Sequence, residues 1–295
     1  MPPLSSGLRL LAVVSAWLAA CSTHAAELTV SAASSLTNAL RDVVPLFEAA
    51  HAGTRVNLNL GASGALLAQM TRGAPVDVFV SADAETMDQA QARGLVRAAQ
   101  RRELVANTLV VVVPGASGDL GAFGASRASG ASDRPGPAGM TPAPVGTSSA
   151  SSASSGPNRS SAPRTLADLT RPGYARIAIG LPASVPAGRY TQAALEAAQL
   201  WGAIKPRMIG AQTVRQALDY VARGEADAGF VYATDAALMP GKVRVAFTVP
   251  TAKPILYPVA PLAASSSPQA AARFVEFLFT PAAQAVFARH GFSRP

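Results

Sequence analysis

The sequence is poor in cysteine, in charge and in aromatic side chains: of 295 residues, one is cysteine, 14% are charged and 6% are aromatic. With Cys21 alone no internal disulfide forms, so stability must come from packing. Beyond the N-terminus no apolar run reaches the roughly 18 residues of a membrane-spanning helix. The net charge of +8 is spread out, without a Lys/Arg cluster or an aromatic ladder. This argues against a nucleic-acid partner.

The residue patterns of an enzyme are also missing. None of the three histidines forms a metal-binding motif with Cys or Glu: His24 lies in or beside the signal, His51 in a helix-end turn, and His290 among the last few residues. There is no Gly-x-Ser-x-Gly elbow, and the loop at Gly61 lacks the Gly-Lys-Ser/Thr of a nucleotide-binding loop. Asp83 and Asp88 are typical of a helix start and an exposed helix face. The sequence therefore predicts a protein that is not an enzyme and uses no cofactor.

The N-terminus is typical of a secretory signal. Arg9 precedes an apolar run over 10–20, which is too short to span a bilayer comfortably. Two alternatives stay open: Leu18-Ala19-Ala20-Cys21 resembles a lipoprotein signal, whereas Thr23-His24-Ala25 offers small residues for ordinary cleavage. Either alternative predicts a periplasmic protein, with 1–26 as the signal and Cys21 as a candidate lipid anchor.

Strands alternate with amphipathic helices in the rest of the chain. Leu36, Leu40, Val43 and Phe47, for example, have the spacing of one helix face. This rhythm predicts an α/β fold with mainly parallel sheets. Strands or extended segments are expected at 28–32, 56–60, 77–81, 109–113, 176–180, 226–232, 243–249 and 255–261. Helices are expected at 36–47, 66–70, 84–93, 188–200, 214–223, from 268, and to 290.

The rhythm is interrupted at 115–164, where Gly, Ala, Ser, Pro and Thr dominate. Such a segment buries too little apolar area to offset its ordering entropy, and we expect a disordered insertion. Two α/β units remain, joined by extended segments and separated by a cleft. The first is expected at 27–108 and 247–295, and the second at 109–246.

Hydroxyl side chains stand where helices begin in the first unit. Ser34 and Ser35 follow the first strand, and Ser63 follows the second. A helix N-terminus has unpaired N–H groups and a partial positive charge, and serine hydroxyls can donate to the same anion. These serines also suit simple N-caps. Because they recur after two strands of one α/β unit, an anion site is the favoured interpretation.

The second unit offers further donors. A Pro and small residues open the helix at 185–190, Gln212-Thr213-Val214 opens the next helix, and Tyr232 ends a strand. A Pro-initiated helix, a Thr213 cap and a core tyrosine are the alternatives. No carboxylate stands in these loops. Protonated phosphate benefits from an acceptor, whereas a dianion such as sulfate, molybdate or tungstate needs donors only.

The sequence resembles the family of periplasmic molybdate-binding proteins of ABC transporters over nearly the whole mature chain. The motifs that carry the resemblance are Ala32–Ala39, Gly73–Asp83, Val185–Gly188, Gly229–Tyr232 and Gly291-Phe292. The resemblance implies a type II periplasmic-binding-protein fold, a monomer, and a transporter permease as partner. It also implies molybdenum only as bound molybdate. The ligand contacts that it implies are Ser35, Ser63, Ala187, Val214 and Tyr232, with Ser34 and Gly64 as secondary candidates.

Other readings stay open. The site also suits another tetrahedral anion, such as sulfate or thiosulfate. A hydrolase or transferase on a similar scaffold is disfavoured by the missing catalytic residues. A surface-anchored adhesion or sensor module is kept open by Cys21.

Overall fold

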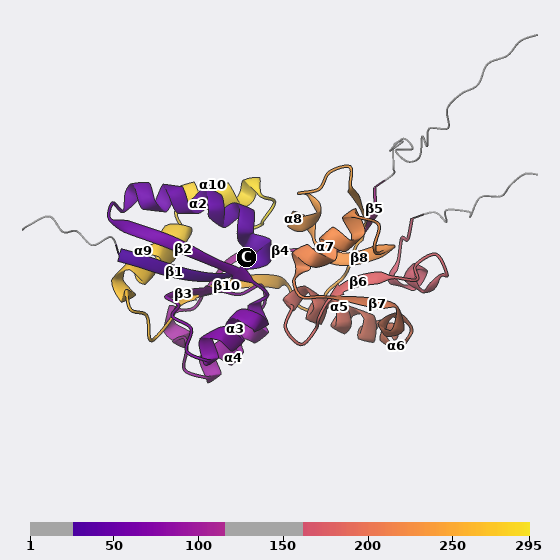
Figure 1. Ribbon diagram of the computed structural model, residues 1–295, viewed down its shortest axis with the longest axis horizontal. Coiled ribbons are helices and arrows are strands. Elements are labelled where there is room, and N and C mark those ends of the chain that lie inside the picture. Colours follow the sequence, from indigo (N-terminus) through magenta and orange to yellow (C-terminus); the bar gives the residue numbers. More distant parts are fainter. Residues whose placement is uncertain (1–25, 116–161) are drawn as a thin grey trace, which may run out of the picture.

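The computed structural model describes residues 26–115 and 162–295. The predicted signal with Cys21 and nearly all of the predicted insertion lie outside these residues. The described chain forms two α/β lobes along the long axis of the molecule (Figure 1). Lobe 1 contains the first and last parts of the described chain, and lobe 2 contains the part between them.

Lobe 1 is built on a five-stranded sheet of order β2-β1-β3-β10-β4. β1 pairs in parallel with β2 and β3, whereas β10 pairs antiparallel with β3 and β4. Leu28, Val30 and Ala32 of β1 are fully buried. The strands are Ala26–Ala33 (β1), Thr54–Gly61 (β2), Val78–Val80 (β3), Arg102–Asn107 (β4) and Ile255–Pro261 (β10).

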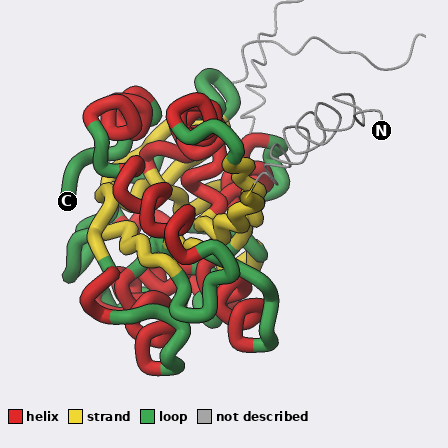
Figure 2. The backbone as a smooth tube through the Cα atoms, turned by 90° about the vertical axis from the view of Figure 1, so that its left-hand side faces the viewer, coloured by secondary structure: helices red, strands yellow, loops and turns green. Residues whose placement is uncertain are grey.

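Helices cover both faces of this sheet. α2 and α10 lie on one side and α3 and α4 on the other (Figure 1), and the end-on view of Figure 2 shows helices above and below the strands. Leu40, Val43 and Phe47 are the buried stripe of α2, as the spacing predicts. The helices are η1 (Ser34–Leu36), α2 (Thr37–Ala50), α3 (Ser63–Thr71), α4 (Ala84–Ala92), η2 (Ala98–Gln100), α9 (Pro268–Leu278) and α10 (Pro281–Arg289).

Lobe 2 is built on a second five-stranded sheet, of order β7-β6-β8-β5-β9. β6 pairs in parallel with β7 and β8, and β5 pairs antiparallel with β8 and β9. α7 and α5 cover opposite faces (Figure 1). The strands are Leu109–Pro114 (β5), Ile177–Gly180 (β6), Met208–Ala211 (β7), Ala228–Tyr232 (β8) and Val243–Thr248 (β9). The helices are η3 (Leu166–Thr170), α5 (Pro186–Ala197), α6 (Trp201–Ile204), η4 (Lys205–Arg207), α7 (Val214–Ala222) and α8 (Ala233–Ala236).

Within residues 26–115 and 162–295 the chain crosses between the lobes twice. The first crossing is Thr108, between β4 of lobe 1 and β5 of lobe 2, and the second is 249–254, between β9 and β10. Each crossing joins strands of two different sheets, so the lobes are connected by short extended segments. None of the helices in the described part of the chain is long and apolar enough to cross a membrane.

The predicted strands and helices are present, with ends shifted by a few residues. β4, β7, α6 and α8 were not predicted. β7 and α6 have four residues each, too few for a periodic pattern.

Candidate functional site

A small cavity between the lobes brings the predicted site residues together. Its empty volume is about 190 Å³. Ser35 and Ser63 face it from lobe 1, and Ala187, Val214 and Tyr232 face it from lobe 2. The remaining lining residues are Ala33, Ser34, Gly61, Ala62, Ala82, Val185 and Pro186. Of the secondary candidates, Ser34 lines the cavity and Gly64 does not.

In lobe 1, Ser35 stands at the end of a chain of hydrogen bonds. It lies in η1, directly after β1, and is 3% exposed. Asn107 Nδ2 donates to the Tyr257 hydroxyl oxygen (3.2 Å), which is 3.0 Å from Ser35 Oγ. Because the tyrosine oxygen accepts from the amide, its own proton is available for Ser35 Oγ. With the bond in that direction the Ser35 proton is free to donate into the cavity, and such a chain of bonds strengthens it as a donor.

Ser63, at the start of α3, is also a serine whose hydroxyl is hydrogen-bonded within lobe 1. The Ala82 N–H donates to Ser63 Oγ at 3.0 Å, and Ser63 is fully buried. Since the oxygen already accepts a bond, the hydroxyl proton remains free to donate into the cavity. The Ser63 backbone N–H is in the first turn of the helix, where no intrahelical acceptor exists. One residue therefore supplies two donors.

Lobe 2 contributes the N-termini of two helices. Ala187 is in the first turn of α5, behind Pro186, and Val214 is the first residue of α7. Pro is suited to this first position because its missing N–H would have no partner there. The Thr213 side chain caps α7 by accepting from Gln216 N–H, as its alternative reading predicted. The N–H groups of Ala187 and Val214 are first-turn donors with the positive end of a helix dipole behind them.

Tyr232 completes the donor set from the end of β8. Its side chain is 1% exposed, and its hydroxyl has no hydrogen-bond partner among the described residues. The alternative of a core tyrosine with a satisfied hydroxyl therefore finds no protein partner among the described residues. Burial raises the pKa of Tyr232 well above its usual value, so the hydroxyl is a neutral donor at ordinary pH. A buried polar atom left without a partner costs free energy, which a ligand at this position would recover.

The residues that line the cavity carry no ionisable acid or base apart from this tyrosine. An ion pair of Arg215 with Asp235 stands beside the lining in sequence: Arg215 follows Val214, and Asp235 is three positions after Tyr232. Asp235 is fully buried, and burial raises its pKa to about 6, against the lowering effect of the Arg215 charge. Among the described residues there is no cluster of three or more His, Cys, Asp or Glu side chains able to hold a metal ion.

Gly64, a secondary candidate for ligand contact, lies outside the cavity lining and at a backbone contact between the lobes. Its N–H donates to the carbonyl of Ser184 in lobe 2 at 3.0 Å. A Cβ at this position would meet the Ser184 carbonyl oxygen at 2.8 Å and its Cα at 2.9 Å. Glycine thus allows the backbones of the two lobes to touch beside the cavity.

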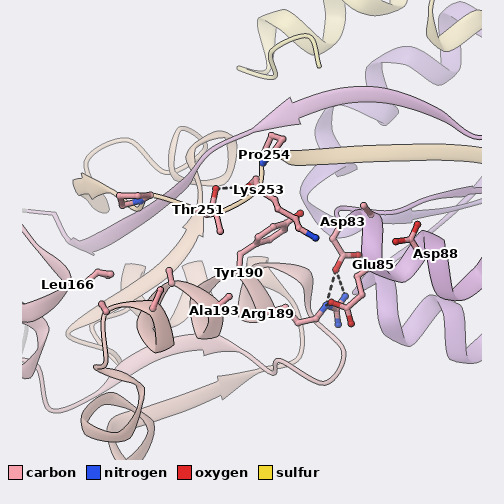
Figure 3. A pocket seen from close by; sticks show the side chains of 16 residues that line it. Asp83, Glu85, Asp88, Leu166, Arg189, Tyr190, Ala193, Thr251, Lys253 and Pro254 are labelled. Atoms are coloured by element: carbon pink, nitrogen blue, oxygen red, sulfur yellow. Dashed lines mark hydrogen bonds and ion pairs between the residues drawn. The ribbon is translucent and has the colours of Figure 1, made fainter.

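An ionic contact also joins the lobes, at the edge of a larger cavity shown in Figure 3. Arg189 of α5 donates to Asp83 Oδ2 through Nε at 2.8 Å and through Nη2 at 2.5 Å, and to Thr86 Oγ1 at 2.6 Å. Asp83 also caps α4 by accepting from Thr86 N–H. The carboxylates of Glu85 and Asp88 line this cavity together with the cationic side chains of Arg189 and Lys253.

Sequence reasoning missed the residues that support the donors. Arg215, Asp235, Tyr257 and Asn107 lie behind the cavity lining rather than in it. The only signal for Arg215 was its position next to Val214, and Tyr257 reads as an ordinary core residue of β10. These contacts join residues far apart in the chain, which no local pattern encodes.

Two α/β lobes, joined by two crossings and presenting donors to each other across a small cavity, define a solute-binding protein. Residues 28–293 match the family described as bacterial extracellular solute-binding protein, and the chain belongs to this family. The family consists of binding proteins and not enzymes, and the resemblance and the two-lobe α/β fold predicted from the sequence are confirmed.

Individual relatives agree with this assignment. The molybdate-binding protein ModA of Escherichia coli (strain K12) is 32% identical over 268 residues, covering 90% of this chain and 89% of that protein. The putative ABC transporter substrate-binding lipoprotein YvgL of Bacillus subtilis (strain 168) is 32% identical and covers 90% of this chain and 86% of that protein. The structure of the Azotobacter vinelandii periplasmic molybdate-binding protein shares the fold, with a TM-score of 0.66 at 23% identity, covering 91% of this chain and 99% of that chain.

Proposed function

We propose that this protein captures molybdate or tungstate between its lobes and delivers the anion to a membrane ABC transporter, acting as an extracytoplasmic monomer. The observation that carries the proposal is the Tyr232 hydroxyl, which is buried and without a partner among the described residues. It faces a cavity whose other polar groups are serine hydroxyls and helix N-termini. We infer that the lobes hinge at the two crossings, Thr108 and 249–254, and close on the anion.

The donor chemistry favours a fully ionised dianion. Ser35 and Ser63 supply hydroxyl protons, and Ala187 and Val214 supply backbone N–H groups. Several charge-assisted hydrogen bonds are needed to replace the water of a buried dianion. Phosphate near neutral pH carries a proton that needs an acceptor, and no carboxylate lines the cavity. Molybdate and tungstate differ from sulfate by longer bonds to oxygen, so cavity size separates these three.

The relatives support the transport role. One is named a molybdate-binding protein and another an ABC transporter substrate-binding lipoprotein. We infer that 1–26 directs export. Lipid attachment at Cys21 and cleavage before Glu27 remain two alternatives, and the intact mass of the exported protein distinguishes them.

Calorimetric titration and thermal unfolding with molybdate, tungstate, sulfate, phosphate and a neutral sugar test the proposal. A ligand at a hundredfold its dissociation constant stabilises the folded protein by about 2.7 kcal/mol. We expect that stabilisation with molybdate and tungstate, less with sulfate, and none with the sugar. Stronger binding of sulfate or thiosulfate than of molybdate would show that the alternative anion is the ligand. No response to any oxyanion would refute an anion site.

A further inference from the structure

Arg215 of lobe 2 reaches across the gap to lobe 1. It is the second residue of α7, immediately after Val214. Its Nη1 donates to Asn38 Oδ1 and its Nη2 donates to the backbone carbonyl of Ser35, each at 3.1 Å. The Arg215 side chain is 25% exposed, so these bonds are partly shielded from water. A residue adjacent to one proposed ligand donor therefore holds another proposed donor on the opposite lobe.

Asp235 lies behind the guanidinium as its ion-pair partner. Arg215 Nε lies 2.5 Å from Asp235 Oδ1 without the geometry of a hydrogen bond, and the carboxylate is fully buried. The Asp235 charge in turn contributes to the raised pKa values of two buried tyrosines, Tyr232 and Tyr257. Asp235 belongs to α8 of lobe 2, so this ion pair lies within one lobe.

The placement of this pair is poorly explained by stability alone. Desolvating a carboxylate offsets much of the attraction in a buried ion pair. A cation in the first turn of a helix is also unfavourable, because the helix dipole is positive there. Both unfavourable contributions apply to Arg215, and its remaining N–H groups bond to lobe 1. The side chain therefore stabilises the protein mainly when the two lobes are in contact.

We propose that Arg215 is a positioning residue of the anion site, which is held by Asp235 and fixes Ser35 when the lobes close. This inference rests on the proposed function. If the lobes separate, Arg215 loses both acceptors in lobe 1 and keeps Asp235. Its two cross-lobe bonds therefore stabilise the closed arrangement alone, and they stabilise it at the donor that the anion contacts.

Positioning makes a different prediction from simple attraction of an anion by a positive charge. Lysine at position 215 would preserve the charge, but a single ammonium cannot bond Asn38, Ser35 and Asp235 in the planar geometry of a guanidinium. If the charge alone mattered, Arg215→Lys would bind like the unmodified protein. If positioning matters, Arg215→Lys loses affinity and releases the anion faster.

The experiment measures molybdate affinity and release rate for the full chain and for Arg215→Met, Arg215→Lys and Arg223→Met. Arg223 ends the same helix at an exposed position, so its variant controls for loss of a positive charge. We expect Arg215→Met to weaken binding about 10- to 100-fold, mainly through faster release, because the two bonds that it loses are partly exposed and act on affinity only through closure. Arg215→Lys should lose most of the same affinity, and Arg223→Met should stay within about twofold of the unmodified protein.

Small-angle X-ray scattering at saturating molybdate adds a readout of closure. The unmodified protein should become more compact with the anion, and the Arg215 variants should do so less completely. Should the unmodified chain bind molybdate while both Arg215 variants bind and compact like the control, the positioning role is refuted and the proposed function stands. An unmodified chain that binds no oxyanion refutes the proposed function, and this inference falls with it. Arg215→Lys keeps a cation beside Asp235, which protects the test against a folding defect in Arg215→Met.

Discussion

Replacing Tyr232 by phenylalanine should have opposite effects on stability and on binding. The ligand-free protein buries a hydroxyl with no partner among the described residues. Such an orphaned group costs about 1–3 kcal/mol. Phenylalanine removes the hydroxyl and keeps the ring, including its edge-to-face contact with Tyr257 at a centroid distance of 5.9 Å. We therefore expect the ligand-free variant to be as stable as the unmodified protein or more stable, by about 1 kcal/mol.

The bound protein should respond in the other direction. A hydrogen bond to a charged group contributes about 1.5–3 kcal/mol. Loss of the Tyr232 donor should weaken molybdate binding by about 10- to 150-fold. For the ligand-free Tyr232→Phe variant, the expected gain of about 1 kcal/mol in the free energy of unfolding corresponds to a rise in Tm of about 2–4 °C for a chain of this size.

Scanning calorimetry without ligand and titration calorimetry with molybdate measure the two effects. Tyr174→Phe is the matched control, because Tyr174 is a buried tyrosine of lobe 2 that does not line the cavity. The reasoning fails if Tyr232→Phe binds molybdate within twofold of the control. It fails equally if the ligand-free variant is less stable by more than about 1 kcal/mol, since the hydroxyl would then have had a partner.

Three further predictions follow from the same geometry. Gly64→Ala should weaken molybdate binding at least tenfold, because its Cβ would meet the Ser184 carbonyl oxygen at 2.8 Å and push the backbones of the two lobes apart beside the cavity. Titration calorimetry measures the affinity, and an unchanged value would contradict the clash. Ser35→Ala and Ser63→Ala should each weaken molybdate binding by about 1–3 kcal/mol in the same titration, and unchanged affinity in both would remove the serines from the site. Burial raises the pKa of Asp235 from 3.8 to about 6 in the folded protein. The unfolded chain therefore loses this proton at lower pH than the folded protein does. As the pH rises between these two values, the free energy of unfolding should fall by up to about 3 kcal/mol. Urea unfolding at about pH 4 and about pH 7 should show that Asp235→Asn lacks this component, and an identical pH dependence in both proteins would contradict the buried carboxylate.

The sequence was informative wherever local chemistry decides structure. Serines directly after two strands predicted hydroxyls at helix starts, and the structure places Ser35 and Ser63 on one cavity. Proline in front of Ala187 predicted a helix start with exposed N–H groups, and α5 begins there. These features depend on neighbouring residues, so a local pattern contains them. Their role as ligand contacts stays a prediction.

The supporting contacts depend on topology and could not be predicted in this way. Arg215 and Asp235 meet because the start of α7 and the end of β8 adjoin in lobe 2, and Arg215 meets Ser35 only across the gap between lobes. Tyr257 reaches Ser35 from β10, which is separated from it by 222 positions in sequence. In the sequence each of these residues looks like a surface charge or an apolar core position. Their partners became visible only once the sheets were placed.

These contacts bear on how the protein can bury a dianion without a cation in direct contact with it. The lobes are already joined by the Gly64 backbone bond, by Arg189 with Asp83 and by Arg215 with Ser35. A ligand shifts a conformational equilibrium only by its difference in affinity for the two states. Because part of the closing free energy comes from lobe-to-lobe bonds, the neutral donors must mainly replace the hydration of the anion. The same bonds must break for release, so strengthening them would slow delivery to a transporter as surely as weakening them would reduce capture.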